Sequence, residues 1–316
     1  MWRKPVRPKG LLSFPLTPFG IDDEVDLDVY TSHLETQLAA DPAGVFVACG
    51  TGEFTALSEA EFRKVVTRAV EVAGGRVPVV AGAGGGPRAA RASAETAADC
   101  GADGVLLLPP YLVSAPPSGV VRYVAYVAET SRLPITVYQR ANAILDPTSA
   151  VDLLDLDNVT GIKDGIGDVE AMLRVVTAVR TSGHRRAEEF EFLNGLPTAE
   201  LSARAYRAIG IPRYSSAVLC FAPDIATAFY RAHDGGDDQT VVTLLKNFYL
   251  PFAELRSQVP GYAVSLVKAG ARLAGLPMGS VRPPLVEATD EHVEQLSEIL
   301  VRARAALTAV SQTVAG

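Results

Sequence analysis

The sequence predicts an α/β fold, namely a (β/α)8 TIM barrel with a C-terminal helical appendage. Short apolar runs rich in β-branched residues alternate with amphipathic helical stretches through most of the 316 residues. Only parallel strands require a helical return, so this alternation indicates a parallel sheet. Roughly eight such units span about 230 residues, which is the usual size of this barrel.

The predicted elements follow in chain order. Each strand is a short apolar run, and each helix places Ala, Val and Leu at three- and four-residue intervals with charged residues between them. The predicted strands are residues 11–17, 44–48, 78–83, 104–108, 134–138, 159–163, 191–194 and 213–216. The predicted helices between them include residues 27–38, 59–72, 88–100, 118–130, 169–179 and 198–209.

After about residue 235 the alternation ends. Residues 237–255, 262–276 and 290–307 have helical spacing with no apolar strand between them. The paired glycines at 235 and 236 are typical of a joint. We therefore expect residues 1–234 to form a barrel that carries the active site, and residues 235–316 to form a helical region packed on it.

An open doubly wound sheet is the competing fold. It normally carries a nucleotide-binding fingerprint after its first strand, whereas residues 14–19 of this chain read FPLTPF. A glycine-rich segment at 82–86 follows the third strand but lacks the rest of such a motif. We interpret that segment as a strand-to-helix loop.

Composition and charge exclude several classes of function. Hydrophobic residues make up 48% and charged residues 21%, and the net charge of −7 comes from interspersed charges, so we expect no nucleic-acid partner. No run approaches the roughly 20 apolar residues of a membrane-spanning helix, so we expect no membrane partner. The three cysteines, an odd number without metal-type spacing, favour a reducing cytoplasmic location. The four scattered histidines predict no metal site.

The sixth predicted strand closes on a lysine, and catalytic groups of such barrels lie at the C-terminal ends of strands. Side chains alternate along a strand, so Gly161 and Lys163 share one face, and we expect the glycine to leave space beneath the lysine. Burial disfavours the charged ammonium and frees a neutral amine to attack a carbonyl. We predict Lys163 as a Schiff-base lysine, with a lysine that extends to solvent at the rim as the alternative.

The fifth predicted strand closes on Tyr138, one strand away from the lysine. Forming and dehydrating a carbinolamine needs a group that passes protons beside the amine, and a phenol fits that need. A tyrosine that only packs its ring and donates one hydrogen bond is the alternative.

The second predicted strand runs into a glycine-threonine-glycine turn. Gly50 and Gly52 let backbone N–H groups approach an anion, and the hydroxyl of Thr51 adds a donor. We predict a carboxylate-binding turn, with a purely structural glycine turn as the alternative. Ser58 and Glu61 are spaced as a capping box for the next helix.

Two later strands end in polar groups. Ser215 and Ser216 close the eighth strand and Gly195 follows the seventh, so these residues are candidates to hydrogen-bond a polyhydroxy acid. Thr198 lies at a strand-to-helix junction, where threonine commonly caps a helix, and we predict that structural role for it.

Together, these segments resemble the dihydrodipicolinate synthase and N-acetylneuraminate lyase superfamily over about residues 10–307. The turn at 50–53, Tyr138 on the fifth strand and the segment 161–164 on the sixth occur in the order and spacing of that superfamily. The resemblance implies that Lys163 forms an imine with a small-molecule 2-oxo sugar acid and that Tyr138 is its proton-transfer partner. It also implies that no metal or other cofactor is needed.

Departures from the synthases narrow the implied activity. The synthases have a second threonine where this chain has Gly50, and an interface tyrosine where it has Leu112, so their proton relay is incomplete here. The resemblance instead implies a dehydratase that removes water and CO2 from a 2-oxo-3-deoxy acid with a carboxylate at each end. Such dehydratases usually carry Asn then Arg after the catalytic tyrosine, whereas this chain has Gln139 then Arg140.

Two other functions stay open: an aldolase of the same superfamily that releases pyruvate, and a non-catalytic sensor of 2-oxo acids.

The resemblance also implies substrate contacts and an assembly state. A homo-oligomer, dimer or tetramer, is expected. The candidate substrate-binding residues are Thr51 and Gly52 for the carboxylate beside the ketone, and Arg140, Asn142, Gly195, Ser215 and Ser216 for the remaining groups.

Overall fold

The computed structural model describes residues 10–315, with side chains described for residues 10–310. Eight parallel strands close into a barrel in sequence order, which confirms the predicted fold class. Closure comes from the first strand, which pairs with both the second and the eighth. The strands are β1 (Leu12–Ser13), β2 (Gly44–Val47), β3 (Val79–Ala83), β4 (Gly104–Leu107), β5 (Ile135–Gln139), β6 (Val159–Asp164), β7 (Glu191–Asn194) and β8 (Arg213–Ser216).

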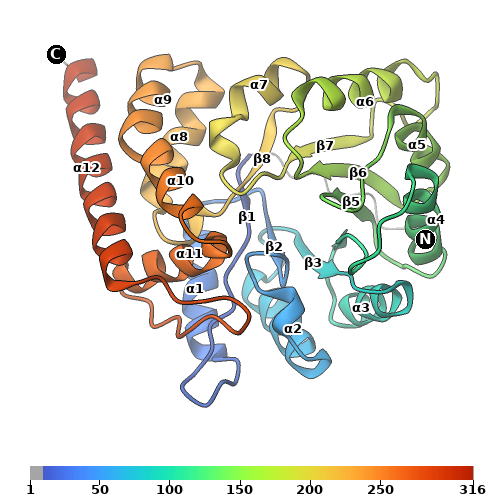
Figure 1. The fold of residues 1–316 in the computed structure, drawn as a ribbon, viewed down its shortest axis with the longest axis horizontal. Helices are drawn as coiled ribbons and strands as arrows, with labels where there is room; N and C mark the ends of the chain where they lie inside the picture. The colour runs from blue at the N-terminus through green and yellow to red at the C-terminus, as the bar shows by residue number, and fades with distance from the viewer. Residues whose placement is uncertain (1–9, 316) are drawn as a thin grey trace.

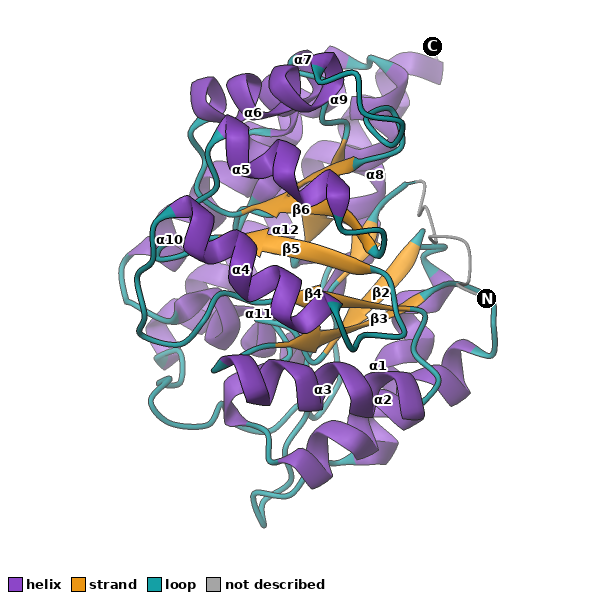
Figure 2. Cartoon of the chain, turned by 90° about the vertical axis from the view of Figure 1, so that its right-hand side faces the viewer, coloured by secondary structure: helices purple, strands orange, loops and turns teal. Residues whose placement is uncertain are grey.

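Helices follow the strands and cover the outside of the barrel (Figure 1, Figure 2). Their apolar faces pack on the outward-facing strand residues to form an extensive core. The predicted capping box at the start of the second helix is confirmed, because Ser58 and Glu61 exchange both of its hydrogen bonds. These helices are α1 (Leu27–Ala39), α2 (Glu59–Ala73), α3 (Pro87–Asp99), α4 (Pro117–Ala128), α5 (Pro147–Asp152), α6 (Val169–Thr181), α7 (Ala203–Ala208) and α8 (Pro223–Gly235).

The first strand is much shorter than predicted. Only Leu12–Ser13 pair as a strand, whereas the sequence predicts residues 11–17. Beyond Ser13 side chains replace the strand ladder: the backbone N–H of Leu16 donates to His33 Nε2 at 3.2 Å, and Thr17 Oγ1 donates to the carbonyl of Gly52 at 2.8 Å. Prolines at positions 15 and 18 have no N–H to offer a ladder, which explains the early end.

The predicted helix at 198–209 is wrong in its first turn. A short 3-10 helix (Ala199–Leu201) precedes α7, and the side chain of Thr198 caps neither. Its hydroxyl instead accepts a hydrogen bond from the guanidinium of Arg256. A long-range contact thus outcompetes the local capping preference of threonine.

The residues after α8 form the expected helical appendage along one side of the barrel (Figure 1). A π-helical turn (Leu245–Tyr249) interrupts the predicted helix at 237–255 just before Pro251, whose ring would clash with an ordinary α-helical carbonyl four residues earlier. The appendage packs on β8 and α8 through a second apolar cluster that contains Phe221, Phe229 and Phe248. Its helices are α9 (Asp238–Leu244), α10 (Leu250–Ser257), α11 (Tyr262–Leu273) and α12 (Asp290–Ala315). The division into domains at 234/235 stays a prediction.

Buried charges fasten the appendage to the turn after β2. Lys268 Nζ on α11 lies 2.7 Å from Glu53 Oε1, and both side chains are almost fully buried. Lys268 also donates to the carbonyl of Ser280 at 2.8 Å, and the backbone N–H of Arg282 donates to Glu53 Oε2 at 3.0 Å. The guanidinium of Arg282 pairs with Glu61 on α2 at 2.6 Å. The appendage and the turn at 50–53 therefore hold each other in place.

Two further properties concern the described part of the chain. None of its helices combines the length and apolarity needed to cross a membrane. Within residues 10–315 no group of three or more His, Cys, Asp or Glu side chains is placed to hold a metal ion.

Candidate active site

A cavity of about 230 Å³ opens at the C-terminal ends of the barrel strands. Its floor is apolar, because Phe14, Leu106 and Tyr138 belong to the cluster that fills the barrel interior. Lys163 and Arg140 are its charged lining residues, and none of the described lining residues is acidic. The cavity is therefore suited to an anion. Its lining residues are Phe14, Cys49, Gly50, Thr51, Leu106, Tyr138, Arg140, Lys163, Gly195, Leu196, Pro197, Ser215, Ala217, Gly261, Ala263, Val264 and Leu285.

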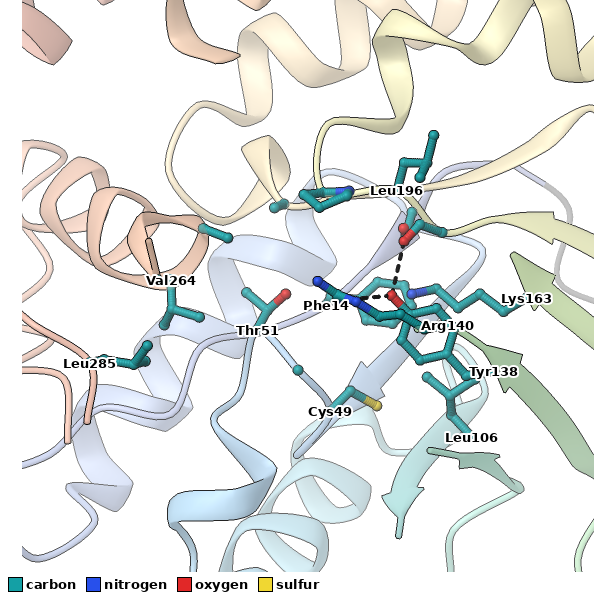
Figure 3. A pocket seen from close by; sticks show the side chains of 17 residues that line it. Phe14, Cys49, Thr51, Leu106, Tyr138, Arg140, Lys163, Leu196, Val264 and Leu285 are labelled. Carbon is teal, nitrogen blue, oxygen red and sulfur yellow. Dashed lines mark hydrogen bonds between the residues drawn. The ribbon is translucent and has the colours of Figure 1, made fainter. Parts of the chain in front are cut away.

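Lys163 extends from β6 into this cavity and is only 5% exposed. Its Nζ lies 4.1 Å from the centroid of the Tyr138 ring and 4.5 Å from that of Phe14 (Figure 3). The lysine does not extend to solvent at the rim; its amine lies between two aromatic rings at the floor of the cavity.

The room beside the lysine comes from a different glycine than expected. A side-chain carbon at Gly161 would lie 2.4 Å from the carbonyl oxygen of Glu191, so the backbone of β7 fills the space at that position. A carbon at Gly195 would lie 2.6 Å from Lys163 Cγ and 2.7 Å from Lys163 Cε. The expectation for Gly161 is wrong, and the absence of a side chain at Gly195 is what lets the lysine stem pass.

Tyr138 is held by two polar contacts. Its hydroxyl donates to the carbonyl of Gly195 at 3.2 Å and accepts from Arg140 Nη1 at 3.3 Å (Figure 3). In the parallel pairing of β5 with β6, Tyr138 lies directly opposite Lys163. A side-chain carbon at Gly165 would come within 2.6 Å of the tyrosine ring, so the ring lies flush against that backbone. The phenol is thus fixed beside the amine.

The turn after β2 brings Gly50 and Thr51 to the cavity, with the Thr51 hydroxyl directed into it (Figure 3). The backbone is left-handed at Ala48 (φ 47°) and Glu53 (φ 54°), a conformation that non-glycine residues rarely adopt. The buried bonds of Glu53 to Lys268 and Arg282 hold this conformation.

Gly52 lies behind the turn and does not line the cavity. Its carbonyl accepts from Thr17 Oγ1, and a side-chain carbon there would lie 3.1 Å from both Ala48 N and Pro15 O. The glycine is needed for close packing beneath Thr51.

The structure separates the other candidate residues into two groups. Gly195, Arg140 and Ser215 line the cavity. Ser216 points to the opposite face of β8, as strand alternation requires, and donates to Glu200 Oε1 at 2.6 Å. Asn142 donates to the carbonyls of Pro110 and Val113 at 2.6 and 2.7 Å and joins two loops at the barrel rim.

Sequence reasoning missed the side of the cavity that the appendage supplies. Gly261, Ala263 and Val264 lie at the start of α11, and Leu285 lies in the loop before α12 (Figure 3). Residues 262–276 have the spacing of a predicted helix, but Leu285 lies in a loop without periodicity. An alternation of strands and helices identifies the barrel and says nothing about which later helix closes its mouth.

Cys49 also lines the cavity, at the end of β2. Burial raises the pKa of its thiol to about 12, although the charge of Lys163 works in the opposite direction. The thiol therefore stays protonated at neutral pH and is a poor nucleophile.

Comparisons with known proteins agree with this architecture. The family model described as the dihydrodipicolinate synthetase family matches residues 7–303. A protein of Streptomyces coelicolor named probable 5-dehydro-4-deoxyglucarate dehydratase 1 is 54% identical, over 93% of each chain. A Streptomyces avermitilis protein of the same name is 52% identical, over 95% of each chain. The solved dihydrodipicolinate synthase of Bacillus clausii superposes with a TM-score of 0.84 at 26% identity, over 92% of this chain and 96% of that one. This chain belongs to the dihydrodipicolinate synthetase family.

Proposed function

We propose that this protein is a 5-dehydro-4-deoxyglucarate dehydratase, a Schiff-base lyase that converts 5-dehydro-4-deoxy-D-glucarate to 2,5-dioxopentanoate, CO2 and water. The observation that carries the proposal is the amine of Lys163 lying 4.1 Å from the Tyr138 ring, in a cavity whose described lining residues include no acidic side chain. The names of the Streptomyces relatives, at 54% and 52% identity, supply the substrate.

The first step joins Lys163 to the ketone of the substrate. The neutral amine attacks the carbonyl carbon, and the resulting carbinolamine loses its hydroxyl as water. Tyr138 is the group positioned to pass the protons that these steps need, since its hydroxyl already lies in a chain from Arg140 to the Gly195 carbonyl. The product is a protonated imine on Lys163.

The imine then acts as the electron sink for two eliminations. It acidifies the neighbouring CH2; loss of that proton gives an enamine, which expels the hydroxyl on the next carbon as water. The conjugated iminium accepts the electron pair of the bond to the distal carboxylate, which leaves as CO2. Protonation of the carbon chain and hydrolysis of the imine release 2,5-dioxopentanoate and the free amine.

The lining residues divide into direct and supporting roles in this proposal. Thr51 and the backbone of Gly50 bind the carboxylate beside the ketone, and Arg140 and Ser215 bind the distal carboxylate and hydroxyls. The remaining candidates act without lining the cavity. Gly52 supports the turn, Ser216 anchors the end of β8, and Asn142 fixes the loop beside Arg140.

Borohydride trapping tests the proposal. Reduction in the presence of a 2-oxo acid fixes the imine as a stable adduct, which peptide mass mapping locates. We expect one adduct, on Lys163, and none in the Lys163→Met variant. Lys64→Met, which removes an exposed lysine on α2, is the matched control and keeps the adduct. An adduct on another residue, or no adduct in the wild-type protein, contradicts the proposal.

An aldolase of the same family is the second candidate, because it would use the same imine. Product analysis separates the two: a dehydratase releases CO2 and a semialdehyde, whereas an aldolase releases pyruvate and an aldehyde. The departures from the synthases at Gly50 and Leu112 favour neither the dehydratase nor the aldolase. We rank the dehydratase first because the relatives carry that name. A non-catalytic sensor would turn over no 2-oxo acid at all.

We also propose that the protein is a homo-oligomer, a dimer or a tetramer. Three consecutive apolar residues at the rim are strongly exposed: Tyr111 (69%), Leu112 (83%) and Val113 (59%). Asn142 ties the nearby loop that carries Ile144, also exposed, to this segment. A second copy of the chain is the proposed cover for such a patch. Light scattering after size-exclusion chromatography tests it, and a monomer at micromolar concentration contradicts it.

A cytoplasmic location stays a prediction from the cysteines.

A further inference from the structure

The carboxylate of Asp164 lies directly behind the Lys163–Tyr138 pair and takes no part in the proposed chemistry. Lys163 and Asp164 are consecutive on β6, so their side chains point to opposite faces of the barrel wall. The side chain of Asp164 is fully buried between the barrel and its helices. Burying a carboxylate is costly unless hydrogen bonds replace its water shell, so its partners identify its role.

Four neutral donors surround this carboxylate. Oδ1 accepts from Gln139 Nε2 at 2.8 Å and from the backbone N–H of Ile166 at 3.2 Å. Oδ2 accepts from the backbone N–H of Gly167 at 3.2 Å and from the hydroxyl of Tyr206 on α7. Burial, assisted by Asp164 itself, raises the pKa of Tyr206, which keeps the phenol protonated and donating.

These donors connect the carboxylate to the strand ends that present the active-site residues. Gln139 follows Tyr138 on β5 and lies opposite Asp164, just as Tyr138 lies opposite Lys163. The side-chain oxygen of Gln139 also accepts from the backbone N–H of Leu145 at 3.2 Å, which fixes the loop that carries Arg140. The backbone carbonyl of Asp164 accepts from the N–H of Gly195 at 2.6 Å.

We propose that Asp164 is a positioning residue for imine formation. Its carboxylate draws the ends of β5 and β6 together through Gln139 and braces them against α7 through Tyr206, so that the Lys163 amine stays against the Tyr138 phenol. The carboxylate suits this task because it is acceptor-only and takes all four donors at once, which a neutral amide cannot do. The inference rests on the proposed role of Lys163.

Asp164→Asn tests the inference, because it keeps the shape of the side chain and replaces one acceptor with a donor. Rapid mixing with pyruvate followed by a borohydride quench measures the rate of imine formation. We expect a decrease of about 10- to 100-fold in that rate. The half-saturating pyruvate concentration should stay within about 3-fold, because the cavity lining is unchanged. The pH dependence of the rate of imine formation should keep the shape that it has in the wild-type protein, because a positioning residue exchanges no proton with the substrate.

Asn158→Ala is the matched control. Asn158 donates to the carbonyls of Ala128 and Ser131 at 2.9 and 3.2 Å just before β6, at the end of the barrel away from Lys163. Its loss removes two hydrogen bonds of the same barrel segment, so it should lower thermal stability and leave the rate of imine formation unchanged. Equal slowing in both variants, or a wild-type rate in Asp164→Asn, overturns the inference.

Tyr206→Phe keeps the test decisive if Asp164→Asn does not fold. It removes one donor and leaves the carboxylate in place, and we expect the rate of imine formation to fall by about 3- to 10-fold. An unchanged rate in a folded Tyr206→Phe protein also overturns the inference. Absence of any adduct in the wild-type protein would instead overturn the proposed function, and with it this inference.

Discussion

Glu200, behind the end of β8, is expected to make the protein less stable as the pH rises towards neutral. Its side chain is fully enclosed, Ser216 Oγ donates to Oε1 at 2.6 Å, and Oε2 has no hydrogen-bond partner among the described residues. Burial raises the pKa of this carboxyl from 4.5 to about 7, although Ser216 and Arg256 favour the charged form. The Glu200→Gln variant removes the titration and keeps an oxygen to accept from Ser216.

The direction and size of the change in the free energy of unfolding follow from the pKa values of Glu200 in the unfolded and the folded protein. Between pH 4.5 and about 7 the folded protein holds a proton on Glu200 that the unfolded chain has lost, so the free energy of unfolding falls as the pH rises. One pKa unit corresponds to about 1.4 kcal/mol, so the loss across this window is about 3 kcal/mol. The full stability is present below pH 4.5, and the decrease is complete once the pH exceeds about 7.

Urea denaturation at pH 5 and pH 8, at one protein concentration, measures this effect. Part of the loss has already occurred at pH 5, so Glu200→Gln should gain about 2.5 kcal/mol relative to the wild-type protein between these two conditions. Glu254→Gln, an exposed carboxyl on α10, is the control and should follow the wild-type curve. Parallel pH dependences for the wild-type protein and Glu200→Gln would show that Glu200 does not titrate in this range, and the reasoning would fail.

Three further predictions concern the site and its supports. Tyr138→Phe removes the hydroxyl beside the amine and should lower kcat by about 10²- to 10⁴-fold, measured by steady-state kinetics. Lys268→Met leaves the buried charge of Glu53 without its cation, so the free energy of unfolding should fall by about 3–5 kcal/mol in urea denaturation. Gly165→Ala places a methyl group where the Tyr138 ring lies at 2.6 Å, so it should displace the ring and lower kcat by about 10-fold with a smaller effect on stability.

Each of these predictions has an outcome that contradicts it. A wild-type kcat in the Tyr138→Phe enzyme would show that the phenol does not transfer the protons. If the double variant Glu53→Gln/Lys268→Met is no more stable than Lys268→Met, the loss does not come from an unpaired charge. Unchanged kcat in Gly165→Ala would mean that the ring position is not critical.

The alternation of apolar runs and helical stretches is sufficient to predict the barrel. It does not predict the end of β1, where side-chain hydrogen bonds replace backbone pairing. The bounds of β7 and β8 agree with the prediction. The first strand is shorter than predicted because Pro15 and Pro18 cannot donate to a strand ladder, and apolar spacing alone does not register this. The contacts that replace the ladder come from His33 and Gly52, which are distant in sequence. Helix α8 was missed even though Ile225 and Phe229 follow helical spacing, so there the signal was present.

The predicted strand ends locate Lys163 and Tyr138 correctly, but not the residues around them. Lys163 and Tyr138 lie where alternation along β6 and β5 puts them, at the floor of the cavity. The same rule turns Ser216 away from the cavity, because Ser215 next to it points inward. Leu285 reaches the cavity only through the path of a loop after α11, and no local pattern encodes that path.

The cavity is assembled from two parts of the chain that differ in how freely they can vary. Lys163 and Tyr138 are on barrel strands, where a shift of backbone would disturb every neighbouring strand. Val264 and Leu285 lie across the mouth on the appendage, at a helix start and in a loop, where side chains can change size without altering the barrel. Substitutions in the appendage can therefore reshape the mouth of the cavity, and with it the choice of sugar acid in the proposed function, without moving Lys163 or Tyr138.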